Sequence, residues 1–309
     1  MSTLSKIVLA LTTYCCALTA SALEFDLPEN GNVVGHVFTA TTVYEDTFLD
    51  VARKYDVAYD ELVAANPGVD VWIPGEGTTV TIPQRFVLPP GEHKGIVINL
   101  AERRLYYFPS GEQKVYTFPI AIGLEATPTP ITQGKVIEKE KDPTWHVPAS
   151  IYAKHLAEGN PVPHSVPPGP DNPLGQFALR LSIPGYLVHG TNRPVSVGQR
   201  MSNGCIRLYP EDIERLFGVA VVGDSVRIIN QPYKVGQDQS GELYLEAHPL
   251  PQEWSKSAVN TNDYAAALIN NHAEFKSFKI NWKAVKRVVE DSNGMPGTIG
   301  RSAATISEK

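Results

Sequence analysis

The segment His189-Gly190-Thr191-Asn192, followed after nine residues by Ser202-Asn203-Gly204-Cys205-Ile206-Arg207, carries the strongest chemical signal in this chain of 309 residues. A thiol that transfers an acyl group needs a base to take its proton and donors for the developing oxyanion. His189 and Cys205 are sixteen positions apart, which is enough chain for a loop to fold back and bring base and nucleophile together. The segment therefore predicts a cysteine acyl-transfer site.

The neighbours of Cys205 add to this prediction. Gly204 permits a tight backbone and close approach of a substrate, and the N–H groups of Gly204 and Cys205 are candidates for an oxyanion hole. Arg207 is expected on the same side of an extended segment as Cys205, where its guanidinium can hold a substrate carboxylate. The alternative for Arg207 is a surface ion pair.

The amino-terminal residues have the form of a secretory signal. Lys6 precedes an apolar run from Ile7 to Leu18, which is too short to span a bilayer, and Ala20-Ser21-Ala22 is a small-residue cleavage site. Residues 1–22 are therefore expected to be a removed signal peptide, with an uncleaved anchor as the alternative. Removal also takes Cys15 and Cys16, so Cys205 becomes the single cysteine of an exported protein. Such a thiol either has a chemical role or is buried and inert.

The composition favours a mainly β fold with a few helices. The chain has 25 Pro and 24 Gly and many short β-branched or aromatic runs. Its net charge of −6 and its lack of Lys/Arg runs argue against nucleic acid as a partner. The histidines show no His-Glu-x-x-His spacing, so neither a metal nor another cofactor is expected.

Four segments follow the leader. Residues 23–35 are interpreted as a linker, and residues 36–84 as a small βααβ unit. Its first helix, capped by Asp46, places Phe48, Val51, Ala52 and Tyr55 on one stripe, and its second helix covers Tyr59 to Ala65. Residues 91–230 read as a β-sheet domain with a helix that begins at Pro210. Residues 231–309 are expected to form a hairpin and two helices, near Asp263 to His272 and Trp282 to Glu290, with a frayed end from Gly294 onward.

A polar and proline-rich stretch, roughly Lys141 to Pro173, shows neither helical nor strand periodicity. Loops of this length inside a compact domain are uncommon unless they serve as lids or binding loops. We expect it to cover the substrate, with a structural wrap around the sheet as the alternative. Trp145 either lines the cleft or packs on the sheet.

The small unit resembles a LysM module. The resemblance rests on Asp46-Thr47-Phe48, on Glu61-Leu62 through Ala65-Asn66-Pro67, and on Val80-Thr81-Ile82-Pro83, with Glu45 where a glycine is usual. It implies binding of the N-acetylglucosamine-containing glycan of cell walls. The alternative is a module that only packs on its neighbour.

The pattern from His189-Gly190-Thr191 to Ser202-x-Gly204-Cys205-Ile206-Arg207-Leu208 resembles the signature of the L,D-transpeptidase (YkuD) family. Pro143-Thr144-Trp145, the Gly169 to Gly175 segment and the LysM-like unit resemble its periplasmic Gram-negative branch. The resemblance implies a β-sandwich catalytic domain. It also implies Cys205 as nucleophile, His189 as base and the Gly190 carbonyl as the group that orients the imidazole. Many members have a histidine where this chain has Asn203. The expected substrate-binding residues are Trp145, Ser202, Asn203, Gly204 and Arg207.

The implied reaction begins when Cys205 attacks the L-centre of meso-diaminopimelate in a peptidoglycan tetrapeptide stem and expels D-alanine. An amine then resolves the thioester. A second diaminopimelate gives a 3→3 crosslink, and a lysine of an outer-membrane lipoprotein attaches that protein to the wall. Water as acceptor would make the chain an L,D-carboxypeptidase or wall hydrolase. A wall-binding protein with an idle site is the remaining alternative.

Overall fold

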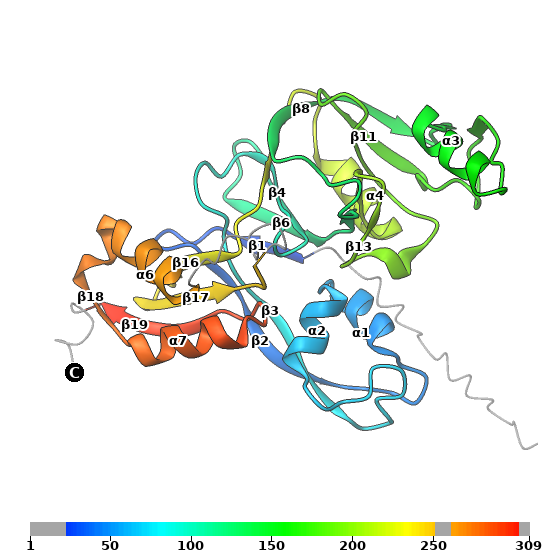
Figure 1. The fold of residues 1–309 in the computed structure, drawn as a ribbon. Helices are drawn as coiled ribbons and strands as arrows, with labels where there is room; N and C mark the ends of the chain where they lie inside the picture. Colours follow the sequence, from blue (N-terminus) through cyan, green and yellow to red (C-terminus); the bar gives the residue numbers. More distant parts are fainter. Residues whose placement is uncertain (1–22, 251–260, 303–309) are drawn as a thin grey trace, which may run out of the picture.

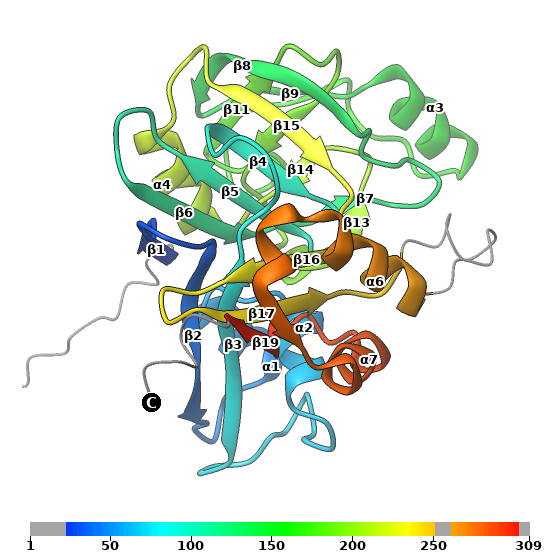
Figure 2. The ribbon, with the colours of Figure 1, turned by 90° about the vertical axis from the view of Figure 1, so that its left-hand side faces the viewer.

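The computed structural model describes residues 23–250 and 261–302, so the expected signal peptide over residues 1–22 lies outside the described part. The described chain is mainly β, as the sequence predicts. Figures 1 and 2 show three units from two sides: a nine-stranded sheet built mainly from the middle of the sequence (the central sheet), a β-α-α-β unit and a carboxyl-terminal four-stranded sheet. No helix within these ranges has the length and apolar character needed to span a bilayer.

The central sheet has the strand order β1-β6-β5-β4-β15-β8-β11-β12-β14. Strand β8 joins its two halves, because its first residues pair with β15 and its later residues pair with β11. Side chains from both halves form one apolar core with helix α4 (Pro210–Val219). The strand bounds are β1 Leu23–Asp26, β4 Gly95–Asn99, β5 Arg104–Phe108, β6 Lys114–Pro119, β8 Thr132–Lys141, β11 Phe177–Leu181, β12 Leu187–His189, β14 Ile206–Arg207 and β15 Ser225–Ile229.

Helix α4 begins at the predicted proline and buries the predicted stripe. Ile213 and Leu216 are almost fully buried, and Phe217 packs on the same core. Pro210 suits the first turn because its missing N–H would have no helical partner there. The helix packs against the sheet directly below the end of β12, where an added Cβ on Gly190 would lie 3.0 Å from Ile213.

Strand β1 corrects the linker interpretation of residues 23–35. It pairs antiparallel with β6 at the edge of the central sheet, in a register that joins Leu23 to Thr117. Leu23, Phe25 and Leu27 alternate with polar residues and pack on a buried cluster, which is the period of a strand with one buried face. Glu24 on the other face pairs with Lys114 and with Arg215. The alternation covers only five residues before the turn residues that follow it, which is too short to predict a strand without its pairing partner.

The β-α-α-β unit consists of β2 (Val33–Thr41), α1 (Phe48–Lys54), α2 (Tyr59–Ala65) and β3 (Thr79–Val87). This is the predicted order, and both strands extend beyond residues 36–84. The predicted cap at Asp46 is wrong, because Thr47 caps α1. The Thr47 side chain accepts from the N–H of Asp50, and the Asp50 carboxylate accepts from the N–H of Thr47 at 2.9 Å.

The carboxyl-terminal unit is a sheet of order β16-β17-β19-β18 with helices on it. The expected hairpin and both helices are present. The frayed end is wrong for residues 297–302, because β19 pairs with both β17 and β18 and buries Ile299, while residues 303–309 of that expected end lie outside the described part. An added Cβ on Gly297 would lie 2.4 Å from Val288, so this apolar-poor strand depends on close packing that its composition does not reveal. The bounds are β16 Tyr233–Gln237, β17 Glu242–Ala247, α6 Thr261–Asn271, η2 Ala273–Ser277, β18 Phe278–Ile280, α7 Trp282–Asp291 and β19 Gly297–Ser302.

Buried charges join the three units. Lys234 on β16 forms ion pairs with Glu102 of the β4–β5 turn and with Glu246 of β17, the latter at 2.8 Å. Its ammonium also donates to the carbonyl of Val87 on β3 (2.5 Å), and Glu246 accepts from the Val87 N–H (2.7 Å). Separating the units would leave the buried Glu102 carboxylate without Lys234 and the Val87 backbone groups without their partners, so the network fixes how the units sit together.

Candidate active site

The fold brings the two ends of the His189–Arg207 segment together. Strand β12 ends at His189, and β14 returns beside it in parallel, with Val188 opposite Ile206 and His189 opposite Arg207. The N–H of Leu208 donates to the carbonyl of His189 at 2.9 Å. Between the strands the chain forms the one-turn helix η1 (Pro194–Ser196) and strand β13 (Arg200–Ser202), which pairs with β7 (Ile122–Gly123). Cys205 lies directly before β14.

A cleft of about 560 Å³ contains most of the predicted site. Two of the eight predicted residues, Gly190 and Gly204, lie next to it in the backbone without lining it. The six that line it are Trp145, His189, Ser202, Asn203, Cys205 and Arg207.

His189 is buried, and its ring contacts the backbone of both Gly190 and Leu174. Its Nδ1 lies 2.6 Å from the carbonyl oxygen of Gly190. Because that oxygen can only accept, we assign the ring hydrogen to Nδ1, which leaves the Nε2 lone pair able to take a proton. Burial, together with the positive charge of Arg207, lowers the pKa of His189 to about 4. The imidazole is therefore neutral at physiological pH.

Cys205 has a protonated thiol in this arrangement. Its Sγ lies 3.7 Å from the carbonyl oxygen of Gly185, to which it donates. Burial raises the pKa of the thiol, while the N–H of Leu187 and the charge of Arg207 act in the opposite direction. Since the thiol and the imidazole are both neutral at rest, proton transfer must accompany the attack on substrate.

The turn before the cysteine is held by Ser202. The Ser202 hydroxyl accepts from the N–H of Gly204 at 3.1 Å and donates to the carbonyl of Cys205 at 2.5 Å. The Gly204 N–H, expected as an oxyanion-hole donor, is therefore already occupied. Gly204 has φ +109°, and an added Cβ would lie 3.1 Å from the ring of Tyr186, so glycine suits this position for both reasons.

Arg207 has no carboxylate partner among the described residues, which contradicts the surface-ion-pair alternative. Its guanidinium donates to the carbonyl of Met201 at 3.4 Å, and its buried Nε has no partner in the described chain. Burial lowers the pKa of this guanidinium, but an arginine stays charged. The cleft thus contains a cation with unused donors, which suits a substrate carboxylate.

The segment from residue 141 to 173 borders the cleft and is more regular than expected. It contains β9 (Trp145–His146), α3 (Ala149–Ala157) and β10 (Ser165–Val166). Pro148 and Ile151 line the cleft beside Trp145, yet α3 has no buried residue. The helix was not predicted because its apolar positions form no stripe.

Sequence reasoning did not select Arg180 and Tyr186, which also line the cleft. Arg180 forms ion pairs with Glu138 (3.2 Å) and Glu140 (2.9 Å), so it resembles an ordinary strand-face charge. Tyr186 lies between the turn at Gly185 and β12, and only its contact with Gly204 marks it. Neither position has a local sequence signal.

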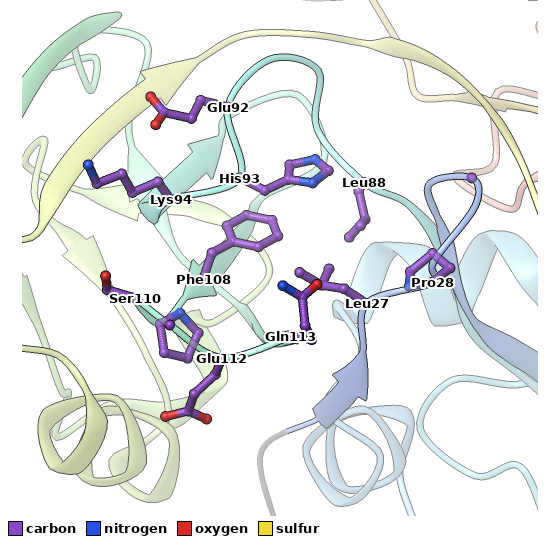
Figure 3. Close-up of a pocket in the computed structure, with 13 residues that line it drawn as sticks. Leu27, Pro28, Leu88, Glu92, His93, Lys94, Phe108, Ser110, Glu112 and Gln113 are labelled. Carbon is purple, nitrogen blue, oxygen red and sulfur yellow. The ribbon is translucent and has the colours of Figure 1, made fainter.

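A second cavity, of about 590 Å³, lies between the β1–β2 connection and the β5–β6 turn (Figure 3). The ring of His93 stacks on Phe108 with centroids 4.7 Å apart, and its Nε2 lies 3.1 Å from the carbonyl of Pro89. Burial lowers the pKa of His93. The histidine is thus engaged in packing, and the described chain places no cysteine in this cavity.

Glu102, Glu246 and His248 are the one group of described side chains with the proximity of metal ligands. Lys234 occupies the position that a cation would need, since its ammonium pairs with both carboxylates. The Nε2 of His248 contacts Glu246 at 2.8 Å. These residues fit an internal ion-pair network and not a metal centre.

Comparison with known proteins places the chain among similar sequences of one family. Residues 93–228 match the L,D-transpeptidase catalytic domain, YkuD. The chain is 40% identical over 252 residues to the probable L,D-transpeptidase YbiS of Escherichia coli K12, covering 80% of this chain and 81% of that protein. It is 38% identical over 298 residues to the probable L,D-transpeptidase YcfS of the same strain, covering 92% and 91%. The solved catalytic domain of the E. faecium L,D-transpeptidase aligns with a TM-score of 0.35 at 23% identity, over 46% of this chain and 100% of that one.

Proposed function

Because the chain belongs to the L,D-transpeptidase family with the YkuD catalytic domain, we propose that Cys205 forms a thioester with peptidoglycan tetrapeptide stems and passes the acyl group to an amine. The observation that carries this proposal is the shared cleft. It holds a thiol, a neutral imidazole and a cation with unused donors. Exposure of the thiol to this cleft argues against a wall-binding protein with an idle site.

In the first half-reaction the thiol proton moves to Nε2 of His189 while sulfur attacks the carbonyl carbon at the L-centre of meso-diaminopimelate. The carbonyl π pair moves to oxygen and forms an oxyanion. Its collapse restores the C=O bond and breaks the C–N bond. His189 returns the proton to the departing D-alanine amine, and a thioester remains.

In the second half-reaction an acceptor amine attacks the thioester, and its proton passes through His189 to the departing sulfur. Arg207 holds a carboxylate of the donor stem in both halves. The acceptor is an amine of a second diaminopimelate or a lysine of an outer-membrane lipoprotein; water in its place would give the carboxypeptidase or hydrolase. The half-buried apolar residues Trp145 and Ile151, which line the cleft from the segment bordering it, support a role in covering the bound stem.

The test uses purified protein and disaccharide-tetrapeptides, with and without lipoprotein, followed by mass spectrometry of the products. The wild type should release D-alanine and form a crosslinked or lipoprotein-linked product, and Cys205→Ala should form none. Appearance of tripeptide alone in every reaction would overturn the transferase in favour of the hydrolase. Trapping the acyl-enzyme at Cys205 by intact mass would test the thioester separately.

The β-α-α-β unit is proposed to bind wall glycan as a LysM module. Its two connecting loops expose large apolar side chains: Tyr44 after β2, and Trp72 and Ile73 after α2. A bond from the Phe48 N–H to the Val71 carbonyl (2.9 Å) holds the loops together. Exposed aromatic rings on a tied pair of loops suit stacking on sugar rings. Such a module would hold the cleft close to its polymeric substrate.

The site of action is proposed to be the periplasm, with residues 1–22 as a removed signal peptide. Peptidoglycan lies outside the cytoplasmic membrane, and residues 1–22 have the three-part form of a secretory signal. A single unpaired cysteine is unusual in such an oxidising location, which supports a chemical role for Cys205. Amino-terminal sequencing of protein recovered from a periplasmic extract tests this, and a mature chain that starts at Met1 would overturn it.

A further inference from the structure

The proline-rich turn Thr127-Pro128-Thr129-Pro130 packs directly against the residue before the nucleophile. Thr129 is 5% exposed, and its hydroxyl accepts from the N–H of Gly123 at 3.0 Å. The same hydroxyl donates to the carbonyl oxygen of Gly204 at 2.8 Å. Because the Gly123 N–H can only donate, the hydroxyl hydrogen is committed to Gly204.

The backbones at this contact touch. An added Cβ on Gly123 would lie 2.2 Å from the carbonyl oxygen of Thr127 and 3.0 Å from Cα of Gly204. Gly204 itself has φ +109°. Glycine has wide conformational freedom, so the residue alone does not fix the orientation of the peptide that follows it. Ser202 holds its N–H and Thr129 holds its carbonyl, so both sides of Gly204 are fixed by hydroxyl groups.

The carbonyl of Gly204 and the N–H of Cys205 belong to one peptide unit. In a planar trans peptide these two groups point in opposite directions. Holding the carbonyl toward Thr129 therefore turns the Cys205 N–H away from that turn. Within the described chain no protein group accepts a hydrogen bond from this N–H, while the sulfur of the same residue lines the cleft.

We propose that Thr129 is a positioning residue that sets the oxyanion hole by fixing the Gly204–Cys205 peptide, so that the Cys205 N–H meets the substrate oxygen. This inference rests on the proposed acyl transfer. With the Gly204 N–H occupied by Ser202, the Cys205 N–H becomes the backbone donor that remains near the sulfur. Its interaction strengthens as the carbonyl oxygen gains charge, so its loss lowers kcat more than it raises KM.

The test compares Thr129→Val, which keeps the branched shape but loses the hydroxyl, with Thr129→Ser, which keeps the hydroxyl. Thr42→Val is the matched control, because Thr42 is a buried threonine of the β-α-α-β unit whose hydroxyl also donates to a backbone carbonyl, that of Gly75. Each protein is acylated with a soluble tetrapeptide stem and with an activated p-nitrophenyl ester. Each is also alkylated with iodoacetamide, a reaction at a saturated carbon that forms no oxyanion.

Loss of one oxyanion donor typically slows acylation about 10²–10³-fold, and we expect this for Thr129→Val with both acyl donors. Alkylation should stay within about twofold of the wild type, Thr129→Ser should recover most of the acylation rate, and Thr42→Val should match the wild type. Equal loss in acylation and alkylation, or no loss in acylation, would overturn the inference.

Failure of the proposed function has a different signature. A wild type that accepts the ester but not the stem would refute the stem as substrate, and the ester rates alone would then decide the role of Thr129. If Thr129→Val does not fold, a crystal structure of the ester-acylated wild type decides instead. The acyl oxygen must accept a hydrogen bond from the Cys205 N–H, and an oxygen that points elsewhere contradicts the inference.

Discussion

At the scale of single residues, the site rests as a neutral thiol and a neutral imidazole that line the same cleft. Burial raises the pKa of Cys205 and lowers that of His189 to about 4, so no thiolate–imidazolium pair stores the nucleophile in its charged form. A cysteine enzyme with such a pair keeps its thiolate down to low pH. The present arrangement instead activates the thiol only when substrate is bound and proton transfer is coupled to attack.

This resting state predicts the pH profile of alkylation. Only the thiolate reacts with iodoacetamide, so the rate at Cys205 should rise about tenfold per pH unit through the neutral range, and no plateau should appear between about pH 5 and 8. The rate is measured by quenching the alkylation at a series of times and determining the intact mass of the protein. His189→Asn should leave the profile nearly unchanged while lowering acylation by about 10²–10⁴-fold. A rate independent of pH from 5 to 8 would show an ion pair and contradict this account.

Arg207 predicts a carboxylate-dependent loss of activity. Arg207→Lys removes the planar fork but keeps the charge, and a charge-assisted bidentate contact is worth roughly 1.5–3 kcal/mol, so kcat/KM for the tetrapeptide stem should fall about 10–100-fold. For a stem in which the carboxylate that Arg207 holds is amidated, kcat/KM should differ little between wild type and variant. Arg215→Lys is the control, since Arg215 pairs with Glu24 outside the cleft. An equal loss of kcat/KM with both stems would mean that Arg207 stabilises the fold and does not bind the carboxylate.

At the scale of elements, the two loops of the β-α-α-β unit predict a separable binding role. Trp72 is 63% exposed beside Ile73, and the carboxylate of Asp70 accepts from the N–H groups of both residues. Trp72→Ala should weaken binding to insoluble peptidoglycan about tenfold, in line with the loss of one stacking ring, while turnover of a soluble tetrapeptide stays unchanged. Co-sedimentation measures binding. Trp282→Ala, which removes an exposed tryptophan of α7, is the matched control. Undiminished sedimentation of the Trp72 variant would favour a module that only packs on its neighbour.

The elements that sequence patterns predicted are those whose signal is local. Pro210 and the apolar stripe that follows it predict helix α4, and an apolar run between two turns predicts β11. The His189–Cys205 pair was predictable because few residue types can serve as the nucleophile and the base of acyl transfer. Thr129 was not, because its role depends on a hydrogen bond to a residue seventy-five positions away. Strands β1 and β19 were missed for the same reason, since an edge pairing and a glycine contact are formed only by the folded sheet.

At the scale of the whole molecule, the β-α-α-β unit meets helix α4 through a mixed set of charges. Arg53 binds Glu211 with two hydrogen bonds, at 2.6 and 2.8 Å, and Arg104 contacts both Glu61 and the carbonyl of Asp56 at 3.2 Å. Asp56 and Asp212 also face each other across this junction. Both oxygens of Asp212 and one of Asp56 are buried without a donor, which is the arrangement of two carboxyl groups that share a proton.

This carboxyl pair predicts how stability depends on pH. Burial, the largest effect, raises the pKa of Asp56 from 3.8 to about 7, and burial with the charges of Asp56 and Glu211 raises that of Asp212. The folded state then binds the proton more tightly than the unfolded state, so this pair stabilises most below about pH 4 and loses its contribution as pH rises toward 7.

Asp56→Asn should reduce that slope, because the amide stays neutral and can donate to Asp212, whose own burial remains. Asparagine also tolerates the φ of +48° at this position. The variant should therefore exceed the wild type in free energy of unfolding at about pH 8, by roughly 1–3 kcal/mol, with the difference shrinking toward about pH 4. Urea unfolding across this range measures it, and Glu45→Gln, at an exposed carboxylate of the same unit, should keep the wild-type slope. Parallel curves for Asp56→Asn and wild type would mean that the two carboxyl groups do not share a proton across this junction.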